Sequence, residues 1–446
     1  MVDSKISDFG SKSISKLLIK QSVPAAIGIL VMSLNILIDT IFVGHWIGSH
    51  AIAAINVVLP VSFFIAALGM SIGVGGSSII SRALGAKTIE KALKTFGNQI
   101  TLTLSLTITF IIFGLNYIDD IIPLFGGKGS IYDSAKTYYR IVLYGVPLLA
   151  LSMMGNTVIR SEGQPKYAMY AMVIPSITNL IFDIILIRYF DLGMLGAAWA
   201  TTGSYAFCFI FIAWFFLSKN SEMKIQAKHF LLKISIVAEI ASLGSITLSR
   251  QAIVSVTYLI MNNILFDFGG ETSVTSYAIV SRMLMFALFP IFGITQGFIP
   301  IAGFNYGANN YDRVKQSIRI AVQYSILLSS LIFIFLFSFP ELITRVFTTD
   351  TLVIQKTPMA LRWVFAATPI IAIQLIGAAY FQAVGKAIPA LLLTLSRQAF
   401  FFIPLIFILP LYYGELGVWI AFPISDLLST LLTAYFLRRE IYYKLQ

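Results

Sequence analysis

The sequence contains few charged residues, and this scarcity excludes most soluble proteins. Asp, Glu, Lys and Arg make up 11% of the 446 residues, whereas soluble domains carry about 25%. Hydrophobic residues make up 58%, which is more apolar surface than a water-soluble chain can bury. The composition therefore indicates an integral membrane protein in contact with a lipid bilayer. It excludes a disordered chain and a nucleic-acid-binding module, so we expect no nucleic-acid partner.

Residues that support catalysis or bind metals are also scarce. The single cysteine, Cys208, cannot form an intrachain disulfide and is expected to pack in a core. Three histidines, His45, His50 and His229, fall in expected loops, and no nucleophile accompanies them. The run Gly73–Gly76 lacks the lysine of a phosphate-binding loop, so we expect it to allow close helix packing. The sequence predicts neither an enzyme nor a cofactor.

Long apolar runs separated by polar clusters indicate an all-α protein with twelve transmembrane helices. A membrane-crossing helix needs about 20 residues, and the runs are far longer than the roughly 10 residues of a barrel strand. The predicted spans are 17–44, 51–81, 92–115, 137–159, 167–187, 194–217, 234–266, 273–304, 314–338, 355–382, 387–410 and 415–437.

The distribution of Lys and Arg predicts the orientation of these spans. Of the 31 such residues, 21 fall on the side that holds both termini and 7 on the opposite side. Positive charge accumulates on the cytoplasmic side of membrane proteins. We therefore expect a multi-pass protein of a bacterial-type cytoplasmic membrane, with both termini in the cytoplasm.

The second half of the sequence repeats the first. A shift of 222 residues places Gly85–Ala92 on Gly307–Val314 and pairs Gly155 with Gly377. A nearly constant offset over about 150 residues indicates duplication.

The repeat predicts two pseudo-symmetric six-helix lobes around a central cavity. We expect the lobes at 1–217 and 234–446, joined by a polar cytoplasmic linker at 218–233. Six spans per repeat give parallel repeats, an arrangement suited to alternating access. This favours a transporter over a channel or an enzyme.

Acidic residues inside the first lobe are the strongest functional signal. Asp39 in span 1 follows Asn35 by four residues, and Asp183 in span 5 follows Asn179 by four residues, so each pair shares a helix face. Buried ionisable groups in spans mark ion pathways by default. We therefore predict a site for one proton or one Na⁺ at Asp39 and Asp183, although such groups can also simply join helices by hydrogen bonds. Further oxygens are expected from Asn156 and Thr201.

The second lobe carries basic residues instead. Arg397 and Asp426 fall near mid-span in neighbouring helices, which leaves open an ion pair or a cavity lined by arginine that favours anionic groups. The other candidates for the substrate cavity are Arg250, Arg282, Gln296, Met32 and Met153, the last two as part of a pliable apolar wall. Pro24 is expected to bend span 1.

The ordered set of local motifs resembles the multidrug and toxic compound extrusion (MATE) family over nearly the whole chain. The motifs are Pro24 with Asp39, Ser81–Ala86, Gly155-Asn156, Glu162-Gly163, Asn179 with Asp183, Gly196–Thr201, Gln296-Gly297 and Asn305–Ala308.

This resemblance implies an exporter of cationic or amphipathic small molecules in exchange for H⁺ or Na⁺. Similarity to the DinF-like branch places the cation site at Asp39, Asn179, Asp183, Thr201 and Asn156, with Pro24 as the bending proline. We expect a monomer. The alternative is a lipid-linked oligosaccharide flippase of related architecture. A membrane-embedded enzyme would need a nucleophile or metal cluster that the sequence lacks.

Overall fold

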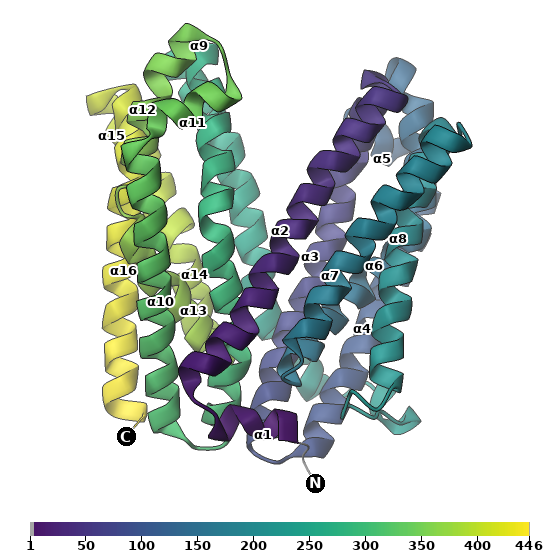
Figure 1. Cartoon of the computed structure of the whole chain (residues 1–446), viewed down its shortest axis with the longest axis vertical. Coiled ribbons are helices and arrows are strands. Elements are labelled where there is room, and N and C mark those ends of the chain that lie inside the picture. The colour runs from purple at the N-terminus through teal and green to yellow at the C-terminus, as the bar shows by residue number, and fades with distance from the viewer. Residues whose placement is uncertain (1–3, 446) are drawn as a thin grey trace. The chain divides into compact units, whose positions relative to one another are not determined.

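The computed structural model describes residues 4–445, and this range is built of helices without a strand (Figure 1). The first half contains α1 (Ser4–Ser11), α2 (Ile14–Trp46), α3 (Ser49–Gly85), α4 (Ile89–Asn116), α5 (Ile118–Leu124), η1 (Gly129–Ile131), α6 (Tyr132–Ser161), α7 (Pro165–Phe182), the π-helical segment η2 (Asp183–Tyr189) and α8 (Gly193–Leu217). The second half contains η3 (Ala227–Phe230), α9 (Ile234–Gly307), α10 (Tyr311–Ser338), α11 (Pro340–Phe347), α12 (Thr351–Phe365), α13 (Thr368–Ala383), α14 (Ala387–Leu395), the π-helical segment η4 (Ser396–Phe402), α15 (Ile403–Tyr413) and α16 (Glu415–Lys444).

The helices account for the predicted spans. Ten helices of the described range are long and apolar enough to cross a membrane, and α12 with α13, bent by 47°, makes an eleventh. The 74-residue helix α9 covers two predicted spans, which meet at Gly270 with φ 67° and ψ −163°. Such a backbone conformation is open to glycine and costly for other residues. The prediction of an all-α membrane protein is confirmed.

The chain divides into two compact units that each take one short segment from the other half of the sequence. Unit 1 comprises 1–8 and 24–247, and unit 2 comprises 9–23 and 248–446. The sequence alone placed 1–217 and 234–446 in separate lobes, joined at 218–233. The difference arises because α2 and α9 each run on unbroken across the boundary, so the first turns of each helix pack in a different unit from the rest. The exchanged segments 9–23 and 234–247 occupy nearly equivalent places in the repeat.

Glycines let helices of unit 1 pack backbone to backbone. A Cβ atom on Gly69 of α3 would lie 2.5 Å from the carbonyl oxygen of Ala150 on α6. A Cβ on Gly75 would lie 2.4 Å from the carbonyl oxygen of Ile240 in the first turns of α9. Both distances are shorter than any side chain tolerates, so these contacts require glycine. The close packing predicted for Gly73–Gly76 is confirmed.

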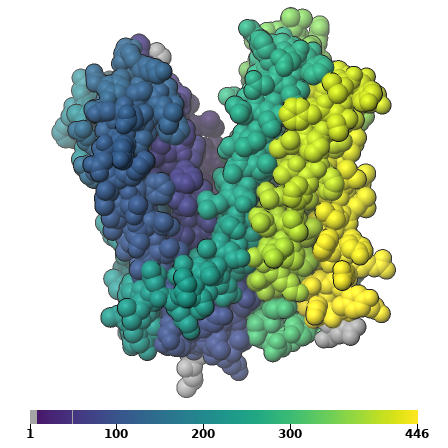
Figure 2. Space-filling view, turned by 180° about the vertical axis from the view of Figure 1, so that it is seen from behind, coloured from purple at the N-terminus to yellow at the C-terminus, as the bar shows by residue number. Residues whose placement is uncertain are grey.

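Each unit has its own apolar core, and its outer surface is also apolar. The cores include Ile55, Val142 and Ala198 in unit 1, and Leu265, Phe365 and Trp419 in unit 2. Figure 2 shows the face of unit 2 that α14 to α16 form, where Ile388, Leu411 and Tyr412 are more than 70% exposed. Apolar side chains exposed on this scale fit a surface that lies in lipid.

The linker between the halves is fixed to unit 1 by hydrogen bonds. The Asn98 side chain on α4 donates to the carbonyl oxygens of His229 and Leu231 and accepts from the Lys233 N–H. After α6, the Glu162 carboxylate accepts bonds from Ser221 Oγ and the Glu222 N–H, both at 2.9 Å. Glu162 is 2% exposed, and burial raises its pKa to about 8, against the effect of these bonds.

Cys208 on α8 is buried, as predicted for a core residue. Its Sγ atom contacts the Ala171 carbonyl oxygen of α7 at 3.0 Å. The thiol therefore contributes to the packing of α7 against α8 in unit 1.

Candidate functional site

The two Asn-x-x-x-Asp pairs lie against each other in unit 1. Asn35 and Asp39 are one turn apart on α2, and Asn179 lies one turn before Asp183, where α7 continues into η2. The Asn35 amide donates to Asn179 Oδ1 at 2.9 Å and to the carbonyl oxygen of Ser176 at 3.1 Å. One turn further along both helices, the Asp39 and Asp183 carboxyl groups lie within hydrogen-bonding reach of each other. The structure therefore brings together all four residues of the predicted pairs.

Asp183 lies in the most enclosed part of this cluster. Its side chain is 0% exposed and that of Asn179 is 6% exposed. Within residues 4–445, neither Asp183 oxygen accepts a hydrogen bond when both carboxyls are ionised. A proton on either carboxyl supplies the missing donor and joins Asp39 to Asp183. Buried carboxyl oxygens without a donor are rare in folded proteins, which makes Asp183 a candidate for holding a proton or cation.

The backbone at Asp183 departs from the regular α-helix. Asp183 is the first residue of η2, whose wider turns end where the Phe190 N–H bonds the Ile185 carbonyl oxygen, five residues earlier. In unit 2, Arg397 lies in the other π-helical segment, η4. Single π-helical turns within α-helices occur frequently at functional sites because they redirect side chains. Sequence periodicity carries no signal for either segment.

Two tyrosines that the sequence analysis did not single out complete the cluster. Tyr138 on α6 is 5% exposed, and its hydroxyl lies 3.2 Å from Thr201 Oγ1 on α8. Tyr138 and Tyr205 are both close enough to Asp39 to interact with it electrostatically. Thr201 and Tyr205 are one turn apart on α8, so the i, i+4 spacing that identified the Asn–Asp pairs was available here too. Thr201 reaches the cluster through Tyr138.

Asn156 does not join this cluster, contrary to expectation. Its amide donates to the Ala168 carbonyl oxygen at 2.5 Å, and its Oδ1 accepts from Arg160 Nε at 3.1 Å. Asn156 and Tyr138 both lie on α6, eighteen positions apart, which separates them by about 27 Å along the helix. Asn156 instead holds Arg160, which is 5% exposed and has no carboxylate partner within residues 4–445.

In unit 2 the charged candidates form one ion pair. Arg397 Nε donates to Asp426 Oδ1 at 2.6 Å, and Asp426 is 2% exposed. Arg250 and Arg282 form no ion pair with a described residue. Arg250 is half-buried, as is Gln296, whereas Arg282 is exposed. Of the two alternatives for Arg397, the structure shows the ion pair.

The remaining candidates lie on helices of unit 1 without a specific polar contact among the described residues. Met32 on α2 and Met153 on α6 are half-buried, and Pro24 lies inside α2 at the first residue of the unit-1 part of that helix. Their assignment to a substrate cavity and to helix bending stays a prediction. In the described range, no group of three or more His, Cys, Asp and Glu side chains forms a metal site.

These features define a duplicated, polytopic helical membrane protein. A family model described as MatE matches the chain twice, at residues 24–185 and 247–408. The two matches begin 223 residues apart, close to the offset of the repeat. The chain belongs to the MatE family of membrane transporters.

Relatives of known description and solved structures are similar to this chain over almost its full length. The chain is 26% identical to the multidrug export protein MepA of Staphylococcus aureus (strain N315), covering 99% of this chain and 98% of that protein. It is 25% identical to MepA of Staphylococcus saprophyticus, with the same coverage. An outward-facing multidrug resistance MATE family transporter of the MOP superfamily has a TM-score of 0.91 and 27% identity, with 99% and 98% of the two chains covered. A MOP superfamily transporter from Pyrococcus furiosus, described as having a binding pocket of reverse polarity, has a TM-score of 0.90, 27% identity and the same coverage.

Proposed function

We propose that the protein is a secondary-active multidrug efflux antiporter. It exports cationic or amphipathic compounds in exchange for H⁺ or Na⁺ by alternating access. The family and the multidrug export relatives support the export of varied small molecules. The contact between the Asp39 and Asp183 carboxyl groups is the observation that supports ion coupling.

Two adjacent carboxyl groups, one half-buried and one fully buried, form a site for one positive charge. Two carboxylates held this close repel each other, and a proton or cation between them removes that repulsion. The Asn179 amide oxygen, fixed by its bond from Asn35, is a neutral ligand of the kind that Na⁺ prefers. Each charge that crosses a potential of 100 mV supplies about 2.3 kcal/mol, which is enough to change the ratio of two conformations about fiftyfold.

Ion binding is coupled to conformation because the two acids lie on different helices. Asp39 belongs to α2 and Asp183 to the α7–η2 segment, so a bound ion draws these helices together and its loss releases them. Pro24 interrupts the hydrogen-bond ladder of α2 and permits a bend between its two parts. Solved relatives described as a MATE in the bent and in the straight conformation are similar to this chain, each with a TM-score above 0.9 and 27% or 26% identity. They support such a motion. The proposed assignment to the DinF-like branch rests on the acidic residues and Pro24 of the first lobe.

The setting of this activity is a bacterial-type cytoplasmic membrane, with both termini in the cytoplasm. The excess of Lys and Arg in the loops on the side of the termini supports this orientation. We propose a monomer, since one chain supplies all four residues of the two Asn–Asp pairs.

The experiment is dye efflux from proteoliposomes under separately imposed proton and sodium gradients. Efflux driven by one gradient alone identifies the coupling ion, and loss of that efflux in Asp183→Asn links it to the site. Asp119→Asn serves as the control, since Asp119 is an exposed acid on α5. No dye movement under either gradient would contradict the proposal. Translocation of a lipid-linked oligosaccharide in the same vesicles would then favour the flippase.

A further inference from the structure

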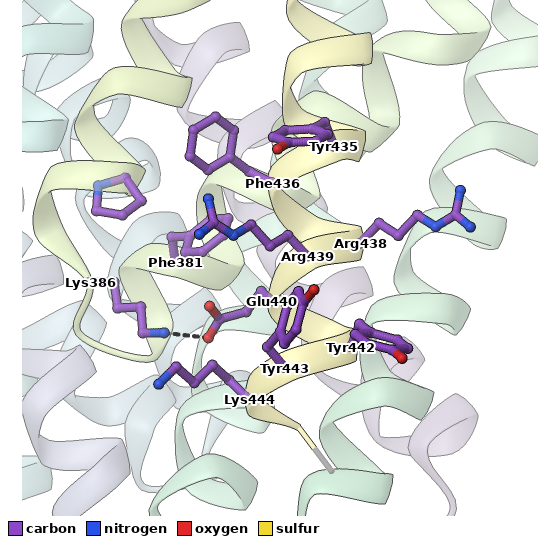
Figure 3. Close-up of a pocket in the computed structure, with 11 residues that line it drawn as sticks. Phe381, Lys386, Tyr435, Phe436, Arg438, Arg439, Glu440, Tyr442, Tyr443 and Lys444 are labelled. Carbon is purple, nitrogen blue, oxygen red and sulfur yellow. Dashed lines mark hydrogen bonds and ion pairs between the residues drawn. The ribbon is translucent and has the colours of Figure 1, made fainter.

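A pocket of about 890 Å³ lies beside the last turns of α16 in unit 2, whereas the Asp39–Asp183 cluster belongs to unit 1 (Figure 3). It is bounded by the end of α13, the start of α14 and one face of α16. The residues that line it include Phe381, Lys386, Pro389, Phe436, Arg439 and Lys444. Nothing in the transport cycle described above uses these residues.

The pocket carries positive charge that the protein itself does not neutralise. Its one acid, Glu440, is 9% exposed, forms an ion pair with Lys386 and accepts a bond from the Tyr380 hydroxyl at 3.4 Å. Arg439 and Lys444 are exposed, and neither pairs with a carboxylate in the described part of the chain. Figure 3 shows both side chains on the Lys386 side of α16, on either side of Glu440. Two cationic groups are therefore available to an anion from outside the chain.

A lipid-facing apolar stripe leads along α16 into this pocket. Leu427, Leu431 and Tyr435 follow one another at four-residue intervals and are 47%, 58% and 61% exposed. On α14, Leu392 is 46% exposed and Ile388 is 73% exposed. Apolar residues exposed on a transmembrane helix contact acyl chains, and tyrosine and basic residues gather where the headgroups begin. The order along α16 therefore matches the order of groups along a phospholipid, from acyl chain to phosphate.

We propose that this pocket binds the headgroup phosphate of an anionic phospholipid. Arg439 and Lys444 pair with the phosphate, and the acyl chains lie along Leu431 and Leu427. Basic pockets between transmembrane helices recognise anionic headgroups through the same interactions. A free phosphate monoester would use Arg439 and Lys444 but would gain nothing from the leucines.

The test measures lipid binding to the purified full-length protein by native mass spectrometry in detergent. The protein is titrated with phosphatidylglycerol, with phosphatidylcholine, and with soluble glycerol 3-phosphate as competitor. The test variant is Arg439→Gln/Lys444→Gln. The control variant is Lys166→Gln/Arg319→Gln, which loses the same charge from two exposed basic residues without an ion pair in the described range. A third variant, Leu431→Gln, addresses the acyl-chain contact.

Wild type and the control variant are expected to prefer phosphatidylglycerol, and the test variant to bind it roughly tenfold or more weakly, because two partners of the phosphate are removed. Leu431→Gln is expected to weaken the binding of phosphatidylglycerol without changing the binding of glycerol 3-phosphate. Unchanged phosphatidylglycerol binding in the test variant would overturn the proposal. Full competition by glycerol 3-phosphate, with no effect of Leu431→Gln, would overturn the lipid assignment and indicate a site for free phosphate. Retained phosphatidylcholine binding in the test variant shows that the variant is folded.

Discussion

The carboxyl groups of Asp39 and Asp183 lie within hydrogen-bonding reach of each other where α2 contacts the α7–η2 segment. When either group is protonated, it can donate a hydrogen bond to the other. No other described side chain donates a hydrogen bond to Asp183. One turn away, the Asn35–Asn179 hydrogen bond holds the same two helices together. In the proposed mechanism, the Asp39–Asp183 pair couples the binding of one ion to the distance between the two helices.

Neutralising either acid is expected to uncouple transport. In Asp39→Asn and Asp183→Asn the site keeps its shape but loses one of the charges that attract the ion, so gradient-driven efflux falls by about tenfold or more. Initial rates of dye efflux at matched protein density measure the effect. Wild-type rates in both variants would show that the ion binds elsewhere.

The Asn35–Asn179 bond is expected to act as a unit. Removing one partner of a buried hydrogen bond costs about 1–3 kcal/mol because the other partner is left unsatisfied. Asn35→Ala and Asn179→Ala should therefore destabilise the protein by similar amounts, and the double variant should cost little more than either. Thermal unfolding in detergent measures all three. Strictly additive losses would mean that the bond does not form in solution.

Asn156 is expected to matter for stability and not for coupling. Asn156→Ala removes an acceptor from the buried Arg160 and a donor from the Ala168 carbonyl oxygen, at a cost of about 1–3 kcal/mol. Its apparent affinity for the coupling ion should stay that of wild type. A shifted ion dependence at normal stability would return Asn156 to the coupling site.

Replacing both members of the Arg397–Asp426 pair is expected to destabilise the protein less than replacing either one alone. Losing one member leaves a buried charge without its partner, which costs about 3–5 kcal/mol, whereas replacing both with apolar residues is often neutral. Arg397→Met and Asp426→Leu should each lower the unfolding temperature. The double variant should regain most of the temperature that each single variant loses. If Arg397→Met left stability unchanged but altered substrate export, the arginine would act on substrate instead.

Glu162 is expected to make the free energy of unfolding depend on pH, and Glu162→Gln is expected to remove this contribution. Burial raises its pKa from 4.5 to about 8 in the folded chain. The folded state therefore binds the proton more tightly than the unfolded state, and this contribution is complete below pH 4.5 and lost as the pH rises towards 8. Unfolding temperatures measured from pH 5 to 8 should fall for wild type and change less for Glu162→Gln. A pH dependence of equal slope in both would assign it to other groups.

The spans and the Asn–Asp faces could be predicted from sequence because both follow from local rules. A long apolar run crosses lipid only as a helix, and residues four apart share a face, which gave Asn35 with Asp39 and Asn179 with Asp183. Which helix faces pack against each other depends on contacts between segments that are distant in the sequence, and no local pattern specifies those contacts. Asn156 was therefore grouped with Asp39 and Asp183, whereas its side chain bonds Ala168 and Arg160.

Other parts of the site depend on features that no local pattern records. Tyr138 lies near Thr201 and Asp39 only because α6 packs beside α8, and nothing in its neighbourhood distinguishes it from Tyr139. The π-helical segment that begins at Asp183 has no marker in the sequence. The exchange of 9–23 and 234–247 between the units likewise follows from packing, since each segment is continuous with its helix.

Infrared difference spectroscopy of the purified protein tests the central claim most directly, because it detects the protonated carboxyl group itself. Spectra are recorded on lowering the pH and on adding Na⁺, for wild type, Asp39→Asn, Asp183→Asn and the control Asp119→Asn. The paired-carboxyl site predicts a carboxyl band that changes with the coupling ion in wild type and in the control and is lost in both site variants. Identical difference spectra in all four proteins would show that Asp39 and Asp183 do not bind the ion.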